Sequence, residues 1–252
     1  MKFAGSSGEA NSGTDIDHNS TTEMIATSAM FKLRTFTIPF TLGLYAQYME
    51  LRAHLSSSVL VLPTFNEREN IERFLHSVRA ANPTLAVIVV DDMSPDGTGA
   101  IVEQMARLDG LISIINRQGK KGLGAAYLAG FARALEAGFD SVLTMDADFS
   151  HDPNTIPALI DALQNGADVV VGSRYVPGGS IVGWPIHRHV LSKYGNFYTR
   201  FVLGLSPRDC TSGFRGYRAT TLSSIDLSTI RGDGYVFLTS ILRRIQQQGL
   251  SI

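Results

Sequence analysis

Two aspartates separated by one residue, Asp146 and Asp148, are the pair in this sequence best suited to chemistry. Alternation in an extended chain places both carboxylates on one side. Carboxylates that close repel each other unless a cation lies between them or one takes up a proton. Hard cations such as Mg²⁺ and Mn²⁺ accept carboxylate oxygens together with substrate phosphate oxygens. The pair predicts a cation site that bridges to a diphosphate; the alternative is a solvated turn.

The elements that must position this pair are short apolar runs alternating with segments of helical periodicity. We expect strands at 59–62, 85–90, 111–115, 141–145 and 168–171, and helices at 67–81, 98–108, 123–137 and 154–165. Continuous apolar strands that alternate with helices are typical of a parallel sheet covered on both faces. The expected fold class is α/β, with an open, mostly parallel, Rossmann-like sheet.

Polar residues follow four of these strands, at the edge where open α/β sheets bind their ligands. The segments are 63–67, 91–98, 146–148 and 172–175. Any single one could be a helix cap, and Asp96 or Thr98 suits a cap of the helix at 98. Polar residues at the ends of four strands together favour a ligand site.

A glycine-rich basic segment, 117–124, follows the third strand and opens a helix. It resembles a phosphate-binding loop, but its spacing fits neither the P-loop nor the dinucleotide fingerprint. A basic helix cap with a glycine-rich entry is the alternative.

The composition bounds the class of protein. Of 252 residues 44% are hydrophobic, which is typical of a globular chain, and the net charge is −1. A globally basic nucleic-acid binder and an acidic disordered chain are both excluded. The single cysteine, Cys210, permits no internal disulfide. The charge is uneven, because residues 56–173 carry a balance of −7 and residues 174–252 one of +7.

The sequence predicts two regions. Residues 1–56 are expected to be a disordered or weakly ordered extension, rich in Gly, Ser and Thr near the start. Residues 57–252 are expected to form one folded α/β domain. The apolar stretch at 36–51 is too short for a membrane span, and we expect no transmembrane helix in this chain.

From Val59 to Ile252 the sequence resembles the family-2 glycosyltransferases of the GT-A fold, and within them the polyprenyl-phosphate (dolichol-phosphate) mannosyltransferases. Six motifs carry the resemblance, at 63–67, 90–98, 121–124, 145–151, 172–175 and 211–215. Trp184-Pro185 with Arg188 and Ser192 favours the mannosyl branch. The resemblance implies that residues 57–252 are a GT-A catalytic domain, which we expect to lack the usual C-terminal strand and basic arm of the family.

The resemblance implies a metal-dependent, inverting transfer of mannose from GDP-mannose to a dolichyl or polyprenyl phosphate, at the cytoplasmic face of a membrane. Asp146, Asp148 and Ser150 would hold Mg²⁺ or Mn²⁺, and Asp148, Arg174 and Arg215 would be catalytic. Trp184, Arg188, Ser192 and Arg215 would meet the acceptor or the membrane. The implied nucleotide-sugar site comprises Pro63, Phe65, Glu67, Val90, Asp92, Lys121, Asp146, Ala147, Asp148 and Arg174.

The implied chemistry agrees with the charge pattern. A lipid monophosphate is already an anion at pH 7, so the displacement needs cations rather than a general base. Two alternatives remain. One is a related transferase that uses UDP-glucose or another nucleotide sugar as donor, or an alcohol as acceptor. The other is an inactive nucleotide-sugar-binding homologue. An alcohol acceptor needs a carboxylate base, and beyond residue 174 only Asp209, Asp226 and Asp233 are available.

The stretch 187–203 predicts an amphipathic helix. At 100° per residue one face gathers Val190, Leu191, Tyr194, Phe197, Tyr198, Phe201 and Val202, while Arg188, Lys193 and Arg200 lie around it. An apolar face with basic neighbours is typical of a helix lying in a membrane interface. The alternative is an ordinary helix packed on the sheet.

Overall fold

The computed structural model describes residues 57–119, 122–176, 186–230 and 232–252, without the side chains of Ile186, Arg188 and His189. The predictions of disorder for residues 1–56, and those made for Lys121 and Trp184, lie outside the described residues. All described residues belong to one compact unit. Within them, no helix is both long and apolar enough to cross a membrane.

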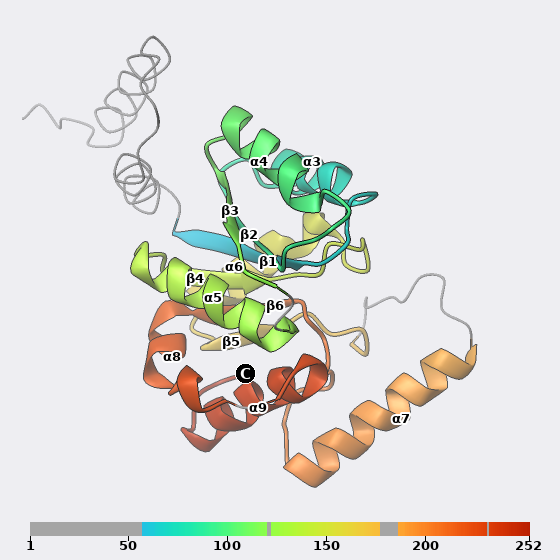
Figure 1. The fold of residues 1–252 in the computed structure, drawn as a ribbon. Helices are drawn as coiled ribbons and strands as arrows, with labels where there is room; N and C mark the ends of the chain where they lie inside the picture. The colour runs from blue at the N-terminus through green and yellow to red at the C-terminus, as the bar shows by residue number, and fades with distance from the viewer. Residues whose placement is uncertain (1–56, 120–121, 177–185, 231) are drawn as a thin grey trace, which may run out of the picture. The chain divides into compact units, whose positions relative to one another are not determined.

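A six-stranded sheet forms the centre of the fold, in the order β3-β2-β1-β4-β6-β5 (Figure 1). Pairing is parallel among β3, β2, β1 and β4, whereas β6 runs antiparallel to both β4 and β5. The strands are β1 (Ser58–Thr64), β2 (Ala86–Asp91), β3 (Ile112–Asn116), β4 (Ser141–Thr144), β5 (Val169–Val171) and β6 (Arg215–Arg218).

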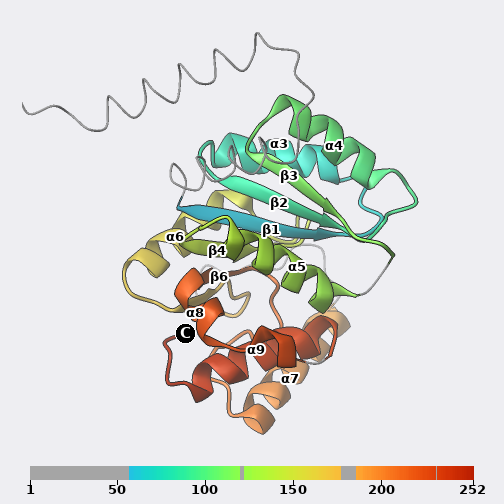
Figure 2. The same cartoon turned by 60° about the vertical axis from the view of Figure 1, so that its left-hand side comes forward.

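Helices cover both faces of the sheet, as the sequence predicted (Figure 2). One core cluster packs α3 (Ile71–Ala81), α4 (Thr98–Leu108) and α6 (Ile156–Gln164) against the sheet. The opposite cluster packs α5 (Leu123–Glu136), α8 (Ala219–Ser224) and α9 (Gly234–Gln247). The remaining elements are η1 (Pro153–Thr155), α7 (Ile186–Leu203) and η2 (Leu227–Thr229).

The five expected strands and four expected helices are present, with boundaries moved by a few residues. One strand was missed. The sequence of β6, Arg-Gly-Tyr-Arg, has no apolar run, yet it lies between β4 and β5 with Arg215 and Tyr217 fully buried. Its pairing with β4 and β5, rather than an apolar pattern of its own, places this strand in the sheet.

Arg215 corrects one site prediction. Its side chain is fully buried, and Nε donates to the Ser212 carbonyl at 2.8 Å. Nη1 donates to the Leu238 carbonyl and Nη2 to the Cys210 carbonyl, both at 2.7 Å. The expected contact of Arg215 with phosphate or acceptor is therefore wrong, because backbone carbonyls occupy its guanidinium and protein covers it.

We expect Arg215→Lys to destabilise the protein by about 2–4 kcal/mol, because an ammonium cannot reach three divergent carbonyls and leaves buried acceptors unpaired. Urea unfolding followed by circular dichroism measures the loss. Arg208→Lys, at an exposed arginine, is the matched control and should change stability little. Equal stabilities of the two variants would contradict the structural role of Arg215.

Candidate active site

A cavity of about 290 Å³ opens at the carboxyl ends of β1 and β4 and beside the start of α5. Seven of the predicted nucleotide-sugar residues line it together: Pro63, Phe65, Glu67, Asp92, Asp146, Ala147 and Asp148. They come from the ends of β1, β2 and β4 and from the loops that follow these strands, which are distant in sequence. The structure thus brings together most of the predicted site, and it does so at the edge where ligands of such sheets bind.

Hydrogen bonds between loops hold two walls of this cavity in place. The amide of Glu67 donates to Thr98 Oγ1 at 2.9 Å, and that of Arg68 donates to Asp96 Oδ2 at 3.0 Å. Asp96 Oδ1 also accepts the amide of Thr98, the first residue of α4, at 2.9 Å, although the N-cap residue of this helix is Gly97. These bonds join the loop after β1 to the loop after β2.

Among the described residues, three other than glycine have positive φ angles, one in each loop after β1, β2 and β4. They are Asn66 (φ 60°), Met93 (φ 56°) and Phe149 (φ 58°). A left-handed backbone costs energy at such residues and persists only where the surroundings enforce it. Such strain gathers at functional sites, which agrees with the position of these loops at the cavity.

Asp92 lies on the cavity wall as half of an ion pair. Arg117 Nη1 is 2.7 Å from Asp92 Oδ1, and both side chains are largely buried. Removal of one partner would leave a buried charge uncompensated. The pair therefore fixes Asp92 at the cavity and leaves its charge largely balanced.

Asp146 is partly buried, and its charge is only partly balanced. Burial, followed by the nearby Asp148 carboxylate, raises the pKa of Asp146 from 3.8 to about 6, although Arg174 acts in the opposite direction. Asp148 is exposed on the same cavity. A Cβ at Gly213 would lie 2.8 Å from Asp146 Oδ2, so glycine is needed for the carboxylate to occupy this position.

These two carboxylates suit a hard divalent cation. Their oxygens are the preferred ligands, and a cation would offset the burial and the repulsion by Asp148 that raise the pKa of Asp146. Within the described ranges, no group of three or more His, Cys, Asp or Glu side chains is arranged for a metal. A cation held by Asp146 and Asp148 would therefore complete its shell with diphosphate or water oxygens. Ser150 donates its amide to Asp148 Oδ1 at 2.9 Å, and its role as a ligand remains a prediction.

Arg174 lies beside this acidic pair but is bound to Asp209. Its Nε and Nη2 donate to the two Asp209 carboxylate oxygens at 2.7 and 2.9 Å, and Nη2 also donates to Thr211 Oγ1 at 2.9 Å. Hydrogen bonding to Asp209 raises the pKa of Arg174, so it stays charged. Its charge reaches Asp146 and lowers the pKa there. Contact of Arg174 with a ligand remains a prediction.

The other predicted residues are absent from the lining of this cavity. Val90 is fully buried in the core cluster that contains α5, so a ligand contact through its side chain is wrong. Ser192 on α7 forms a 2.8 Å hydrogen bond with the Tyr175 hydroxyl. The side chain of Arg188 lies outside the described residues, as do Lys121 and Trp184.

Four cavity residues were missing from the predicted site: Thr64, Gly122, Leu123 and Ala126. Three of them belong to the start of α5, and Gly122 has a positive φ of 87°. The glycine-rich segment 117–124 was the available signal, and the sequence left it open between a phosphate-binding loop and a basic helix cap. The structure shows that its end forms a wall of the cavity.

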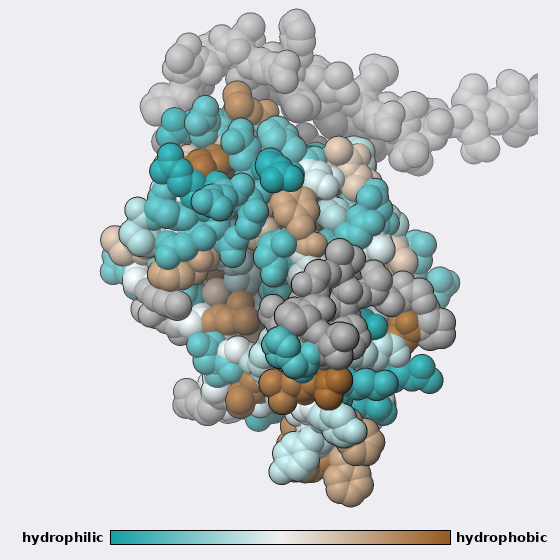
Figure 3. Space-filling model, turned by 90° about the vertical axis from the view of Figure 1, so that its right-hand side faces the viewer, coloured by the Kyte–Doolittle hydropathy of each residue, from teal (hydrophilic) through white to brown (hydrophobic). Residues whose placement is uncertain are grey.

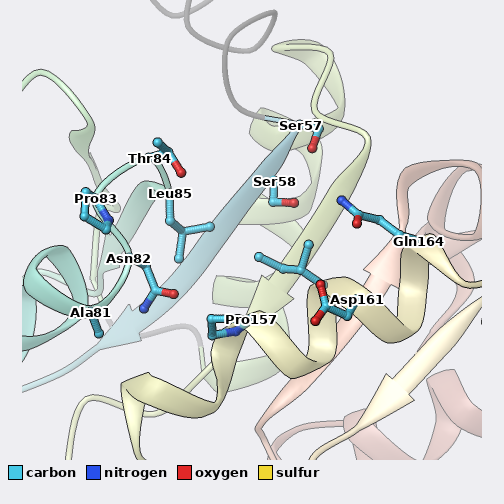
Figure 4. Close-up of a pocket in the computed structure, with 11 residues that line it drawn as sticks. Ser57, Ser58, Ala81, Asn82, Pro83, Thr84, Leu85, Pro157, Asp161 and Gln164 are labelled. Carbon is cyan, nitrogen blue, oxygen red and sulfur yellow. The ribbon is translucent and has the colours of Figure 1, made fainter.

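A second hollow, of about 370 Å³, lies at the opposite edge of the sheet (Figure 4). Figure 4 shows Ser58 at the start of β1, Asn82 and Leu85 before β2, and Asp161 on α6 around it. No predicted site residue lines it, and it is remote from the strand ends that carry the acidic pair. The cavity with Asp146 and Asp148 is therefore the candidate active site.

We predict that Asp146→Asn stabilises the cation-free protein at pH 7.5. The raised pKa of Asp146 favours the folded state below the unfolded pKa near 3.9, and this contribution is lost as pH rises through about 6. The wild type should therefore be less stable than the variant by about 2–3 kcal/mol at pH 7.5, with the difference vanishing near pH 4. Thermal melts in EDTA across this pH range measure it.

Addition of MnCl₂ in place of EDTA provides the second arm of this test. At pH 7.5 it should raise the melting temperature of the wild type more than that of Asp146→Asn. A cation can neutralise the charge of the Asp146 carboxylate, whereas the asparagine amide has no charge to neutralise. A variant that is no more stable at pH 7.5 than the wild type, with an equal response to Mn²⁺, would show that Asp146 carries no uncompensated charge.

Comparison with known proteins places this geometry in a family. The model of "Glycosyl transferase family 2" matches residues 59–225. The chain is 45% identical over 196 residues to the polyprenol monophosphomannose synthase of Mycolicibacterium smegmatis, covering 77% of this chain and 74% of that protein. It is also 45% identical to the undecaprenyl-phosphate mannosyltransferase of Micrococcus luteus, covering 76% of this chain and 79% of that protein.

Solved structures share the fold at lower identity. Glucosyl-3-phosphoglycerate synthase from Mycobacterium tuberculosis, in complex with Mn²⁺, UDP and phosphoglyceric acid, superposes with a TM-score of 0.54 at 20% identity, covering 86% of this chain and 72% of that one. A mannosyltransferase from Pyrobaculum calidifontis with GDP-Man and Mn²⁺ gives a TM-score of 0.51 at 16% identity, covering 88% and 63%. The expected GT-A fold is confirmed.

The family match spans the strands whose ends build the cavity, from β1 through β6, and the two relatives extend the similarity over three quarters of the chain. The chain belongs to glycosyl transferase family 2 and is a glycosyltransferase.

Proposed function

We propose that this protein transfers a mannosyl group from GDP-mannose to a polyprenyl (dolichyl) phosphate, with inversion at the sugar carbon and with Mg²⁺ or Mn²⁺ as cofactor. The 45% identity to two proteins named for mannosyl transfer to polyprenyl carriers supports it most strongly. Both alignments cover about three quarters of each chain. GT-A neighbours that hold Mn²⁺ with UDP or GDP-Man are consistent with the cofactor and donor.

The donor side of the proposal rests on the cavity. Phe65 and Glu67 after β1 and Asp92 after β2 would contact the base and ribose, and Asp146 and Asp148 would face the diphosphate. A cation bound there supplies positive charge to the leaving diphosphate. Because burial and the nearby Asp148 raise the pKa of Asp146, positive charge is most needed beside that carboxylate.

The acceptor side favours a phosphate over an alcohol. An alcohol would need a carboxylate base, but the acids beyond residue 174 already have structural partners. Asp209 binds Arg174, Asp226 accepts the amide of Ser228 at the start of η2, and Asp233 accepts the amide of Gly234 at the start of α9. A phosphate monoester needs no such base, since it is already ionised at pH 7.

The test is transfer of label from a panel of nucleotide sugars to polyprenyl phosphate, measured in the organic phase with Mn²⁺ present. We expect label from GDP-mannose, abolished by EDTA and reduced at least 100-fold by Asp148→Ala. Asp161→Ala, at an exposed acid on α6, is the matched control and should retain activity. If label came from UDP-glucose alone, the proposed donor would be wrong. Nucleotide binding without turnover would identify an inactive homologue.

Helix α7 supports a lipid acceptor, because its apolar face is exposed among the described residues. All seven residues predicted for that face are exposed, from 48% for Val190 to 79% for Phe201. In Figure 3 apolar side chains gather at the lower end of the visible face, where α7 lies. The helix is confirmed, and in the described part of the chain its apolar face does not pack on the sheet.

The last turns of α7 are nevertheless fixed to the domain. Asn196 is buried, donates to the Arg208 carbonyl and accepts the amide of Cys210 at 2.8 Å. Leu203 packs against the core. The helix thus holds its apolar face outward on a rigid base, and we propose that this face lies in the membrane interface, with basic residues of the terminal third drawn to anionic lipid.

Flotation with liposomes containing anionic lipid tests the role of α7. We expect the wild type to float, less so at high salt, and Phe197→Asp or Phe201→Asp to reduce bound protein at least fivefold, since each buries a charge in the interface. Leu108→Asp, at an exposed leucine on α4, is the matched control and should still float. Unaltered flotation of both α7 variants, with melting temperatures unchanged, would exclude this surface.

A further inference from the structure

Asp233 connects two helices that are far apart in sequence. It precedes α9, beyond the residues matched by the family model. Its Oδ1 accepts the amide of Gly234, which caps its own helix, at 2.8 Å. The same oxygen accepts the amide of Gly124, in the first turn of α5, at 2.9 Å. One carboxylate therefore serves the amino ends of both helices.

The packing around Asp233 leaves little freedom. A Cβ at Gly122 would collide with the Asp233 carboxylate, and a Cβ at Gly124 would lie 2.9 Å from the Phe237 ring. Tyr127, one turn further along α5, stacks on Phe237 with ring centroids 6.0 Å apart. The first turns of α5 and α9 thus interlock, with glycines at the points of closest approach.

The segment that Asp233 holds is a wall of the candidate active site. Gly122, Leu123 and Ala126 line the cavity, whereas Asp233 does not. The carboxylate also lies where an anion would bind at the amino end of α5, and its negative charge is favoured there. The chain thus supplies its own carboxylate to this helix end.

We propose that Asp233 is a positioning residue of the nucleotide pocket, which fixes the first turn of α5 as the wall against which a nucleoside diphosphate binds. The inference rests on the proposed function in one respect, that the cavity takes a nucleotide. It extends the donor site to α9, an element outside the family match.

The experiment compares Asp233→Ala, Asp233→Asn and a matched control, Asp226→Ala. The asparagine keeps a carbonyl oxygen for both amides, whereas the alanine keeps none. Asp226 caps η2 in the same manner, by accepting the amide of Ser228 at 3.1 Å, but it is exposed and does not line the cavity. Binding of GDP and of UDP with MnCl₂ is measured by calorimetry at a temperature where circular dichroism shows each variant folded.

We expect Asp233→Ala to raise the dissociation constant about tenfold, and the KM for the donor similarly, with kcat at saturating donor within about twofold. Asp233→Asn should stay within about threefold of the wild type, and Asp226→Ala should match it. Hydrogen exchange without nucleotide supplies a second measurement: amides of 122–126 should exchange faster in Asp233→Ala and not in Asp226→Ala.

Faster exchange in Asp233→Ala with an unchanged dissociation constant would overturn the positioning role and leave the proposed function intact. Unchanged exchange would overturn the contact itself. A wild type that binds neither nucleotide would overturn the proposed function and, with it, the role of Asp233 in nucleotide binding.

Discussion

The buried guanidinium of Arg215 is the interaction on which the acidic end of the site depends. It ties the carbonyls of Cys210 and Ser212 to that of Leu238 on α9, and so fixes the turn that leads into β6. From that turn, the Gly213 carbonyl accepts the Thr144 hydroxyl at 2.7 Å, and the Gly213 backbone packs against the Asp146 carboxylate. A charge buried for structural reasons thus determines where the functional carboxylate lies.

The position of Asp146 has an energetic cost that a cation would offset. Taking a carboxylate out of water beside a second carboxylate favours its protonated form, and the raised pKa records that penalty. An ordinary surface acid would avoid the penalty but would also bind a cation less tightly. Functional sites often lower the stability of the folded protein in exchange for ligand binding, and the position of Asp146 agrees with this trade-off.

The sequence predicted those parts of the fold whose signal is local. Apolar runs gave β1, β2 and β4, and polar residues after them gave the cavity, because parallel strands present their carboxyl ends at one edge. β6 could not be predicted, since Arg-Gly-Tyr-Arg lacks an apolar pattern and its position depends on pairing with two strands distant in sequence. Asp233 was equally hidden, because its partner Gly124 lies 109 residues away and neither carries a motif for the contact.

The net charge of +7 in residues 174–252 suggests free basic side chains for an anionic ligand, but many of these side chains have partners within the protein. Several arginines of this region bind the chain itself: Arg174 pairs with Asp209, while Arg215, Arg218 and Arg244 donate to backbone carbonyls. A guanidinium that binds a neutral carbonyl keeps its positive charge, so the long-range attraction to an anionic membrane survives this internal use. The close grip on an acceptor phosphate is another matter, because it requires free N–H groups. A surplus of charge can therefore attract the acceptor to the domain without identifying the residues that hold it.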